Sequence, residues 1–198
     1  KHSFLISERI RMDRKEVIKI TLELMKEKKL EKTTIGEIVK RLDLSPGSLY
    51  YHFKNKSEIY KEMADYSLEE ITRNLNEVRT AESNKNKLFI LTRALIKFLE
   101  EREEILFFLI SMKGSCYLEE EIKSQDFLIN FKNILLTEQQ DVNHKKRMLL
   151  KLNMFLGSIY EVLYDSKLVN GRNLAEFEIR DIHASFWGNE ILDTKYNN

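Results

Sequence analysis

Apolar residues recur along the chain at spacings of three and four residues, with polar residues between them. This period places the apolar side chains on one face of a helix and predicts an all-α chain. A single proline and 6 glycines in 198 residues agree, because a β-rich fold uses both in its turns. The long helices that the pattern predicts run over about Asp13–Lys28, Lys56–Val78, Lys87–Arg102, Glu103–Lys113, Glu119–Leu136, His144–Lys167 and Asn173–Asp193.

Two helix starts follow the first long helix in quick succession. Thr34 and Glu37 form an S/T-x-x-E capping box, in which the hydroxyl accepts an N–H of the first turn and the carboxylate reaches back to the cap residue. This pair opens a short helix that ends near Leu42. Ser45 offers a second cap oxygen, and Pro46 takes the first helical position, where its missing N–H costs nothing. A second short helix therefore begins at Pro46.

The connection between these two helices is short. Asp43, Leu44 and Ser45 separate them, and a turn of this length crosses two helices steeply instead of folding them back antiparallel. The turn needs one residue with positive φ, which Asp43 tolerates better than most residues other than glycine. Asn55 with Glu58 repeats the cap pattern and opens a third helix. The pattern predicts a helix-turn-helix whose core is Val17, Ile20, Leu24, Leu30, Ile35, Ile38, Val39, Leu42, Leu44, Leu49 and Phe53.

Two strings carry a family resemblance: TTIGEIV at 33–39 and LDLSPGSLYYHFKNKSEIY at 42–60. They resemble the tetracycline-repressor (TetR) family of bacterial one-component transcriptional regulators, whose signature has T-x-x-x-I-A, a G-V-S turn and L-Y-x-H-F-x-x-K-x-x-L. The resemblance covers roughly residues 13–60. It implies an N-terminal three-helix DNA-binding domain, which we place at 12–60, joined by a long helix to a C-terminal helical domain at 61–198 that binds a ligand and dimerises.

In such motifs the second helix lies in the major groove and the helix before it crosses the DNA backbone. By this geometry, the residues expected to reach base edges or adjacent phosphates are Pro46, Gly47, Ser48, Tyr51 and Lys54. The phosphate contacts that the resemblance implies are Thr34, Tyr50, His52 and Lys56. The chain departs from the signature at Lys28 and Lys29, where a glycine usually ends the helix, at Asp43 in place of the turn glycine, and at Val39 in place of alanine. None of these departures removes a DNA-facing position.

Charge is divided unevenly along the chain. Residues 1–60 carry 14 Lys or Arg against 9 Asp or Glu, whereas residues 61–198 carry 19 against 23. Phosphate neutralisation drives most non-specific DNA affinity, so a basic N-terminal part agrees with DNA binding. The alternative is an ordinary solvated surface, since lysine-rich helices are common.

The C-terminal part contains a set of aromatic and sulfur-containing residues that could line a ligand pocket between helices. They are Phe107, Phe108, Met112, Cys116, Tyr117, Phe127, Phe131, Phe155 and Tyr160. Pockets of helical bundles are lined in this way, and so are ordinary cores. A pocket of this composition favours an apolar or amphipathic effector, with a tyrosine hydroxyl as its polar contact. Glu103, Glu104 and Glu119–Glu121 could suggest a cationic effector, but the helix dipole explains acidic residues at helix starts more simply.

The last two predicted helices, 144–167 and 173–193, are apolar on more than one side. A helix that is apolar on two sides needs two partners. One side can pack on its own domain and the other on a second subunit, in a four-helix arrangement with two helices from each chain. The alternative is a monomer whose core uses both sides. The resemblance favours the homodimer, because members of the family pair through their last two long helices.

Several classes of protein find no support in the sequence. No H-E-x-x-H, C-x-x-C, Gly-rich phosphate loop or G-x-S-x-G appears, and the four histidines lie far apart, at His2, His52, His144 and His183. We therefore expect no enzyme, no metal site and no cofactor. The longest apolar run, Ile105–Met112, is too short to cross a membrane, and a single Cys agrees with a reducing cytoplasm. No signal peptide is expected, and residues 1–11, which precede Met12, are assigned no function.

These observations together predict a cytoplasmic one-component transcriptional regulator. The favoured form is a repressor that binds an inverted-repeat operator as a homodimer and is released by a small apolar or amphipathic effector. Activation instead of repression stays open. The alternative is a helix-turn-helix protein that acts through protein contacts without any small-molecule effector.

Overall fold

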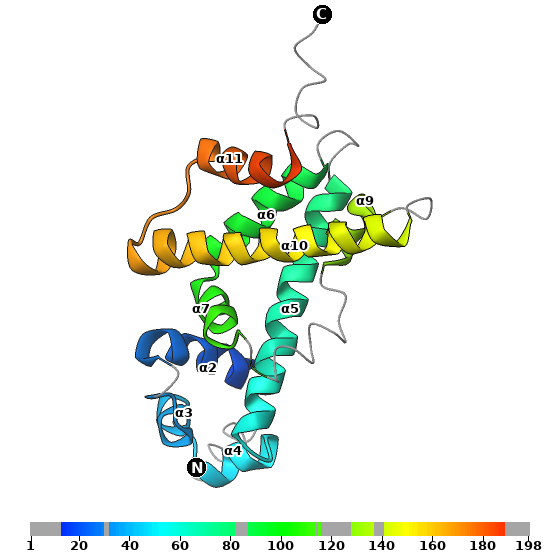
Figure 1. Ribbon diagram of the computed structural model, residues 1–198. Coiled ribbons are helices and arrows are strands. Elements are labelled where there is room, and N and C mark those ends of the chain that lie inside the picture. Colours follow the sequence, from blue (N-terminus) through cyan, green and yellow to red (C-terminus); the bar gives the residue numbers. More distant parts are fainter. Residues whose placement is uncertain are drawn as a thin grey trace, which may run out of the picture. The chain divides into compact units, whose positions relative to one another are not determined.

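The computed structural model describes residues 13–29, 32–81, 87–113, 115, 128–136 and 141–188. Every regular element in these ranges is helical (Figure 1), and the prediction of an all-α chain is confirmed. The helices are α2 (Arg14–Lys28), α3 (Ile35–Arg41), α4 (Pro46–His52), α5 (Lys56–Ala81), α6 (Lys87–Glu101), α7 (Glu103–Ser111), α9 (Ile129–Leu135), α10 (Val142–Leu163) with a π-helical extension (Tyr164–Val169), and α11 (Glu176–Trp187). None of these helices combines the length and the hydropathy that a membrane crossing requires.

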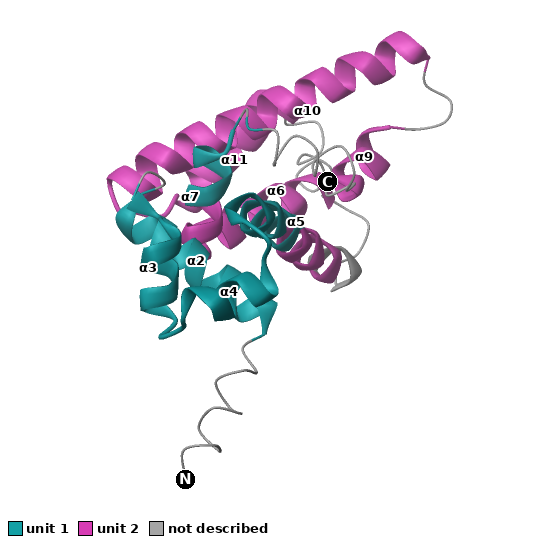
Figure 2. Ribbon diagram, turned by 90° about the horizontal axis from the view of Figure 1, so that it is seen from below, with its two compact units in different colours: residues 1–68, 107–125 teal, residues 69–106, 126–198 magenta. Residues whose placement is uncertain are grey.

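The chain divides into two compact units (Figure 2). Unit 1 comprises residues 1–68 and 107–125, and unit 2 comprises residues 69–106 and 126–198. Helix α5 begins in unit 1 and ends in unit 2, so one uninterrupted helix belongs to both. The domain boundary that the sequence suggests after residue 60 stays a prediction.

Unit 1 contains the three-helix arrangement expected from the caps. Asp13 caps α2 by accepting a hydrogen bond from the Lys15 N–H. Two ion pairs, Arg41 with Glu27 and Lys28 with Glu37, join α2 to α3. Of the predicted core, the buried residues are Val17, Leu24, Ile38, Val39, Leu42, Leu49 and Phe53, the half-buried ones are Ile20, Ile35 and Leu44, and Leu30 lies outside the described residues.

Among the described residues of unit 1, Lys29 and Asp43 have positive φ although neither is glycine. Asp43 has φ 51°, as predicted for the turn between α3 and α4. Lys29, which follows α2, has φ 66° and ψ 163°, a combination that only glycine adopts without strain. The Thr33 hydroxyl donates a hydrogen bond of 2.9 Å to the Lys29 carbonyl. This contact holds the chain in a conformation that the usual glycine would take more readily.

Unit 2 is built around α6, which contacts α9, α10 and α11. One face of α6 is buried along its whole length, including the carboxylate of Glu100. That carboxylate accepts hydrogen bonds from the backbone N–H of Leu174 and from the Lys97 ammonium, and Lys97 also donates to the Leu174 carbonyl at 2.9 Å. The segment before α11 is thereby fastened to α6 through its backbone.

The end of α10 differs from the predicted helix. The α-helical pattern stops at Leu163 and widens to the π-helical extension, after which Gly171 at φ 65° reverses the chain. The last helix begins at Glu176 and not at Asn173 as predicted, and the Asn173 side chain accepts a hydrogen bond from the Lys167 ammonium. The Glu178 carboxylate accepts the N–H of Ala175, the residue that precedes α11.

Candidate nucleic-acid interface

Helix α4 starts and stops where its sequence indicates. The Ser45 hydroxyl accepts the Ser48 N–H at 3.1 Å, and Pro46 occupies the first helical position. The helix ends because Phe53 is extended, at φ −134° and ψ 125°. Its inner face contributes Leu49, which together with Phe53 is fully buried. The opposite face is free to meet another molecule.

The residues predicted to approach the bases share this outer face. Pro46, Gly47 and Ser48 are exposed, and Tyr51 is the most exposed large apolar side chain among the described residues, at 82%. The Ser48 hydroxyl lies 2.9 Å from the Ser45 hydroxyl and keeps further hydrogen-bonding capacity. The structure therefore brings these residues together on one short helix.

Two of the predicted phosphate contacts flank that face on α4 itself. Tyr50 is 51% exposed, and His52 is half-buried. The rings of Tyr51 and His52 meet edge to face, with centroids 5.3 Å apart and planes at 87°. This stacking restricts both side chains to one side of the helix end.

Thr34 caps α3 as predicted, but only half of the capping box forms. The Thr34 hydroxyl accepts the Glu37 N–H at 3.3 Å. The Glu37 carboxylate does not reach back to Thr34, because it pairs with the ammonium of Lys28 on α2, and this pairing lowers the pKa of Glu37.

Lys54 and Lys56 flank the start of α5. Lys54 is exposed, and the ammonium of Lys56 lies 5.1 Å from the centre of the Tyr60 ring. Asn55 accepts the Glu58 N–H at 2.9 Å as predicted, whereas the Glu58 carboxylate accepts the Lys54 N–H at 2.7 Å and not that of Asn55. The helix start is thus capped twice, with Lys54 exposed and Lys56 half-buried beside it.

Arg14 is the residue of this site that sequence reasoning missed. Its guanidinium donates to the carboxylates of Glu58, at 2.9 Å, and of Glu62, and also to the His52 carbonyl at the end of α4. The same group lies 4.5 Å from the centre of the Phe53 ring. One side chain on α2 therefore holds the end of α4 against the start of α5. The spacing of the two glutamates at i and i+4 is the only signal in the sequence that could have indicated a shared partner.

A cleft of about 850 Å³ lies beside Thr34. Its lining is Glu27, Lys28, Lys29, Lys32, Thr34 and Glu37. Lys29 and Lys32 are exposed there. They add positive charge next to a predicted phosphate contact, although the motif itself did not indicate them.

The comparisons with known proteins agree with this geometry. Residues 17–63 match the profile of the family described as bacterial regulatory proteins, tetR family. Over 54 residues the chain is 32% identical to the HTH-type transcriptional regulator AcrR of Shigella flexneri, a match that spans 27% of this chain and only 25% of AcrR.

Solved structures extend the likeness to the whole fold. A TetR family transcription regulator from Marinobacter aquaeolei VT8 superimposes with a TM-score of 0.67 at 15% identity, covering 92% of this chain and 96% of that one. The fatty acid degradation regulator FadR of Bacillus halodurans gives a TM-score of 0.66 at 14% identity, covering 87% and 93%.

Helices α2 to α4 and the start of α5 form a tetR-family DNA-binding domain. The predicted family resemblance is thereby confirmed over residues 17–63. In the described ranges, no three His, Cys, Asp or Glu side chains gather as a possible metal site. The DNA contacts assigned to single residues of the tetR-family domain stay predictions.

The residues predicted to line a ligand pocket outside the tetR-family domain fall in both units. Phe107, Phe108 and Met112 belong to unit 1, Phe131, Phe155 and Tyr160 belong to unit 2, and Cys116, Tyr117 and Phe127 lie outside the described residues. Phe131 and Phe155 are fully buried with ring centroids 5.9 Å apart. Phe155 also packs against the rings of Phe186 and Trp187. Burial raises the pKa of Tyr160 to about 12, so its hydroxyl stays protonated.

The carboxylate of Glu58 gives the tetR-family domain a pH dependence that can be measured. The Lys54 N–H and then Arg14 lower the pKa of Glu58 below its ordinary 4.5. Its stabilising effect is therefore complete above about pH 4.5 and is lost as the pH falls through the lowered value. We expect Glu58→Gln to lower the urea midpoint of unfolding at about pH 7 and to lower it less at about pH 3, because protonation of the folded-state carboxyl removes the charge that the substitution also removes.

The matched control is Glu23→Gln, which removes an exposed carboxylate of α2. It should leave the midpoint nearly unchanged at both pH values. An equal deficit of Glu58→Gln at both pH values would contradict the assigned role of its charge.

Proposed function

We propose that this chain is a transcriptional regulator that inserts α4 into the major groove of DNA. The observation that carries the proposal is the exposed outer face of α4, held in a fixed orientation by Arg14 within a tetR-family domain. Ser48 and Tyr51 have the chemistry to read base edges through hydroxyl and ring contacts. Pro46 and Gly47 allow close approach, because neither carries a long side chain.

Phosphate contacts surround this reading face. Thr34, Tyr50, His52 and Lys56 supply hydrogen-bond donors, and Lys54 adds a charge at the end of α4. Such contacts fix the position of a protein on the duplex without reading its sequence. The excess of basic residues in 1–60 supports the same assignment.

We assign the homodimer to the outer face of α10 and to α11. On α10, Leu150 is 61% and Met154 is 60% exposed, although both are large and apolar. Gly157 follows on the same face, and a Cβ added there would meet nothing within 4 Å. On α11, Phe177 is 66% exposed. A second copy would bury these residues by the same face on both chains, as a two-fold dimer requires.

A dimer brings two reading helices to the DNA and therefore selects an inverted repeat. The regulator we propose is a repressor that a small apolar or amphipathic effector releases. The effector binds among the helices of 87–167, where unit 2 contains an aromatic core. Helix α5 is continuous from the tetR-family domain into unit 2, so a change in its tilt alters the spacing of the reading helices. The effector lowers the DNA affinity a hundredfold if it binds the form with the wrong helix spacing about 2.7 kcal/mol more tightly than the form that binds DNA.

The division of roles at the DNA interface is tested by mutation. The operator is first selected from random duplexes, and affinities are then measured by fluorescence anisotropy over a range of salt concentrations. Lys56→Ala should weaken operator and random DNA about equally and reduce the salt slope by about one. Ser48→Ala and Tyr51→Ala should change the preferred sequence by about 1–3 kcal/mol for each lost base contact.

Lys19→Ala is the control for the lysine, since Lys19 is exposed on α2. It should bind like the unmodified chain. Equal effects of all three interface substitutions on operator and random DNA would overturn the assigned roles.

The dimer face is tested by light scattering at micromolar concentration. The chain should have the mass of a dimer, and Met154→Glu should have the mass of a monomer, because it places a charge where two apolar faces meet. Val169→Glu changes another exposed apolar residue, 59% exposed, beyond α10 and should remain a dimer. A monomeric parent chain, or a Met154→Glu variant that still dimerises, contradicts this interface.

The effector is tested by titrating medium-chain fatty acids and planar aromatic compounds against operator-bound protein. A compound that binds unit 2 should lower the DNA affinity about a hundredfold. Phe131→Ala and Phe155→Ala should alter that response in variants whose helix content is intact, whereas Val142→Ala, at a position 67% exposed, should not. DNA affinity that no bound compound changes would favour a regulator without an effector.

A further inference from the structure

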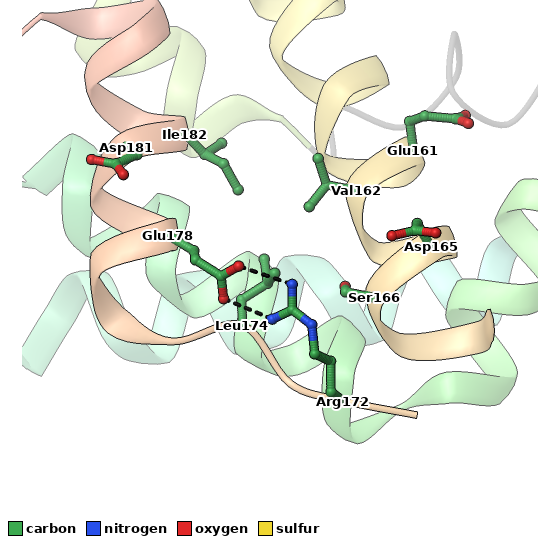
Figure 3. Close-up of a pocket in the computed structure, with 9 residues that line it drawn as sticks. All are labelled: Glu161, Val162, Asp165, Ser166, Arg172, Leu174, Glu178, Asp181 and Ile182. Atoms are coloured by element: carbon green, nitrogen blue, oxygen red, sulfur yellow. Dashed lines mark hydrogen bonds and ion pairs between the residues drawn. The ribbon is translucent and has the colours of Figure 1, made fainter. Parts of the chain in front are cut away.

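The outer face of α10 carries charged groups as well as the apolar ones assigned above to the dimer. Its exposed residues run in order from a basic pair through two apolar side chains to an acid: Lys146 and Arg147 (the basic pair), Leu150, Met154 and Glu161. Figure 3 shows the Glu161 carboxylate directed away from α11 and from the cleft of about 550 Å³ between the end of α10 and α11. This carboxylate can therefore contact a molecule on the outer side of α10.

The charges of this face are arranged against the dipole of their own helix. After its cap residue Asp141, α10 has no acidic residue in its first turn and no basic residue in its last turn. Lys145 and the basic pair stand near its start instead, and Glu161 stands in its last turn. A helix dipole favours the opposite distribution. No ion pair within the described ranges involves Lys146 or Glu161, so a partner outside the chain would compensate both charges.

The spacing of these groups is symmetric about Met154. Arg147 lies seven residues before Met154 and Glu161 lies seven residues after it, which is close to two helical turns and about 10 Å along the axis in each direction. Leu150 precedes Met154 by four residues, and Gly157 follows it by three. A Cβ added to Gly157 would meet nothing within 4 Å, so the surface there is open. A large apolar side chain and an open surface therefore lie at nearly equal distances from Met154.

We propose that two copies of α10 pair in an antiparallel register centred on Met154. In this register the partner's Glu161 lies beside the basic pair, and the partner's Leu150 lies over the open surface at Gly157. The basic start of each helix then lies beside the acidic end of the other. A parallel register would instead place each Glu161 against its own copy, and like charges in contact are unfavourable. The inference rests on the homodimer proposed above and adds the register and the charged contacts that select it.

Cross-linking of the full chain tests the register. The only cysteine is first replaced by Cys116→Ser, and each variant is oxidised with copper phenanthroline at micromolar concentration. Met154→Cys should form a disulfide-linked dimer, because a residue on the two-fold axis meets its own copy within the reach of a disulfide. Glu161→Cys is the matched control on the same face. Its two copies would lie about 21 Å apart along the antiparallel helices and should not link.

The results separate the register from the dimer itself. A disulfide through Glu161→Cys would indicate parallel pairing. A disulfide through neither variant, in chains that scatter light as dimers, would indicate that α10 faces another surface of the partner, such as α11. Either result overturns the proposed register and leaves the homodimer standing. A parent chain with the mass of a monomer overturns both.

Charge exchange tests the contact between Glu161 and the basic pair. Glu161→Lys should raise the dimer dissociation constant about tenfold or more at low salt, because the two-fold axis repeats each substitution. Lys146→Glu with Arg147→Glu should do the same. None of these changes should unfold α10, since each follows the helix dipole, and the helix content of each variant is measured.

All three substitutions in one chain restore opposite charges across the axis and should recover most of the dimer affinity. Glu101→Lys makes the same charge change at an exposed position of α6 and should have no effect. A folded triple variant that dimerises no better than Glu161→Lys contradicts the proposed contact. So does a Glu161→Lys variant that dimerises as tightly as the parent chain.

Discussion

The orientation of α4 depends on one guanidinium group. Arg14 supplies donors in a rigid plane, and the structure places an acceptor from α4 and two from α5 around it. Removing the side chain would leave the carboxylates of Glu58 and Glu62 and the carbonyl of His52 without this partner. Lysine could not replace it, because a single ammonium cannot direct donors to three groups in one plane. The apolar core brings the helices together, and this charged contact determines the angle at which the reading face is presented.

In unit 2 the central group of such contacts is a carboxylate that accepts hydrogen bonds, in place of a guanidinium that donates them. Buried carboxylates on its helices, Glu100 and Glu70, each collect donors from more than one segment. Glu70 on α5 pairs with Arg102, which lies between α6 and α7 and also binds Glu104. Burying a carboxylate is costly unless its partners compensate, so these contacts select one packing arrangement more than they add stability. Directional polar contacts therefore orient helices in both units, where apolar packing alone would allow several arrangements.

The features that could be predicted from the sequence are those that depend on residues close together in the chain. The cap at Ser45, the strained turn at Asp43 and the exposed face of α4 all follow from residues a few positions apart, and the structure contains each of them. Contacts between distant segments had no such signal. Arg14 and Glu62 are 48 residues apart, and the pair of Glu37 with Lys28 replaced a local cap because a helix neighbouring in space offered a stronger partner. For the aromatic set, composition could not separate a core from a pocket, since both require the burial seen for Phe131 and Phe155.

The continuity of α5 has a consequence for how this chain can change over generations. The helix contains 26 residues and so is about 39 Å long. Each residue added to it or removed from it rotates everything beyond by about 100° and shifts it by about 1.5 Å. Substitutions on its exposed side leave that geometry unaltered, whereas a single insertion would place unit 2 on a different side of the helix. The length of α5 is therefore under a tighter constraint than its sequence, and variation in length is expected to concentrate outside it.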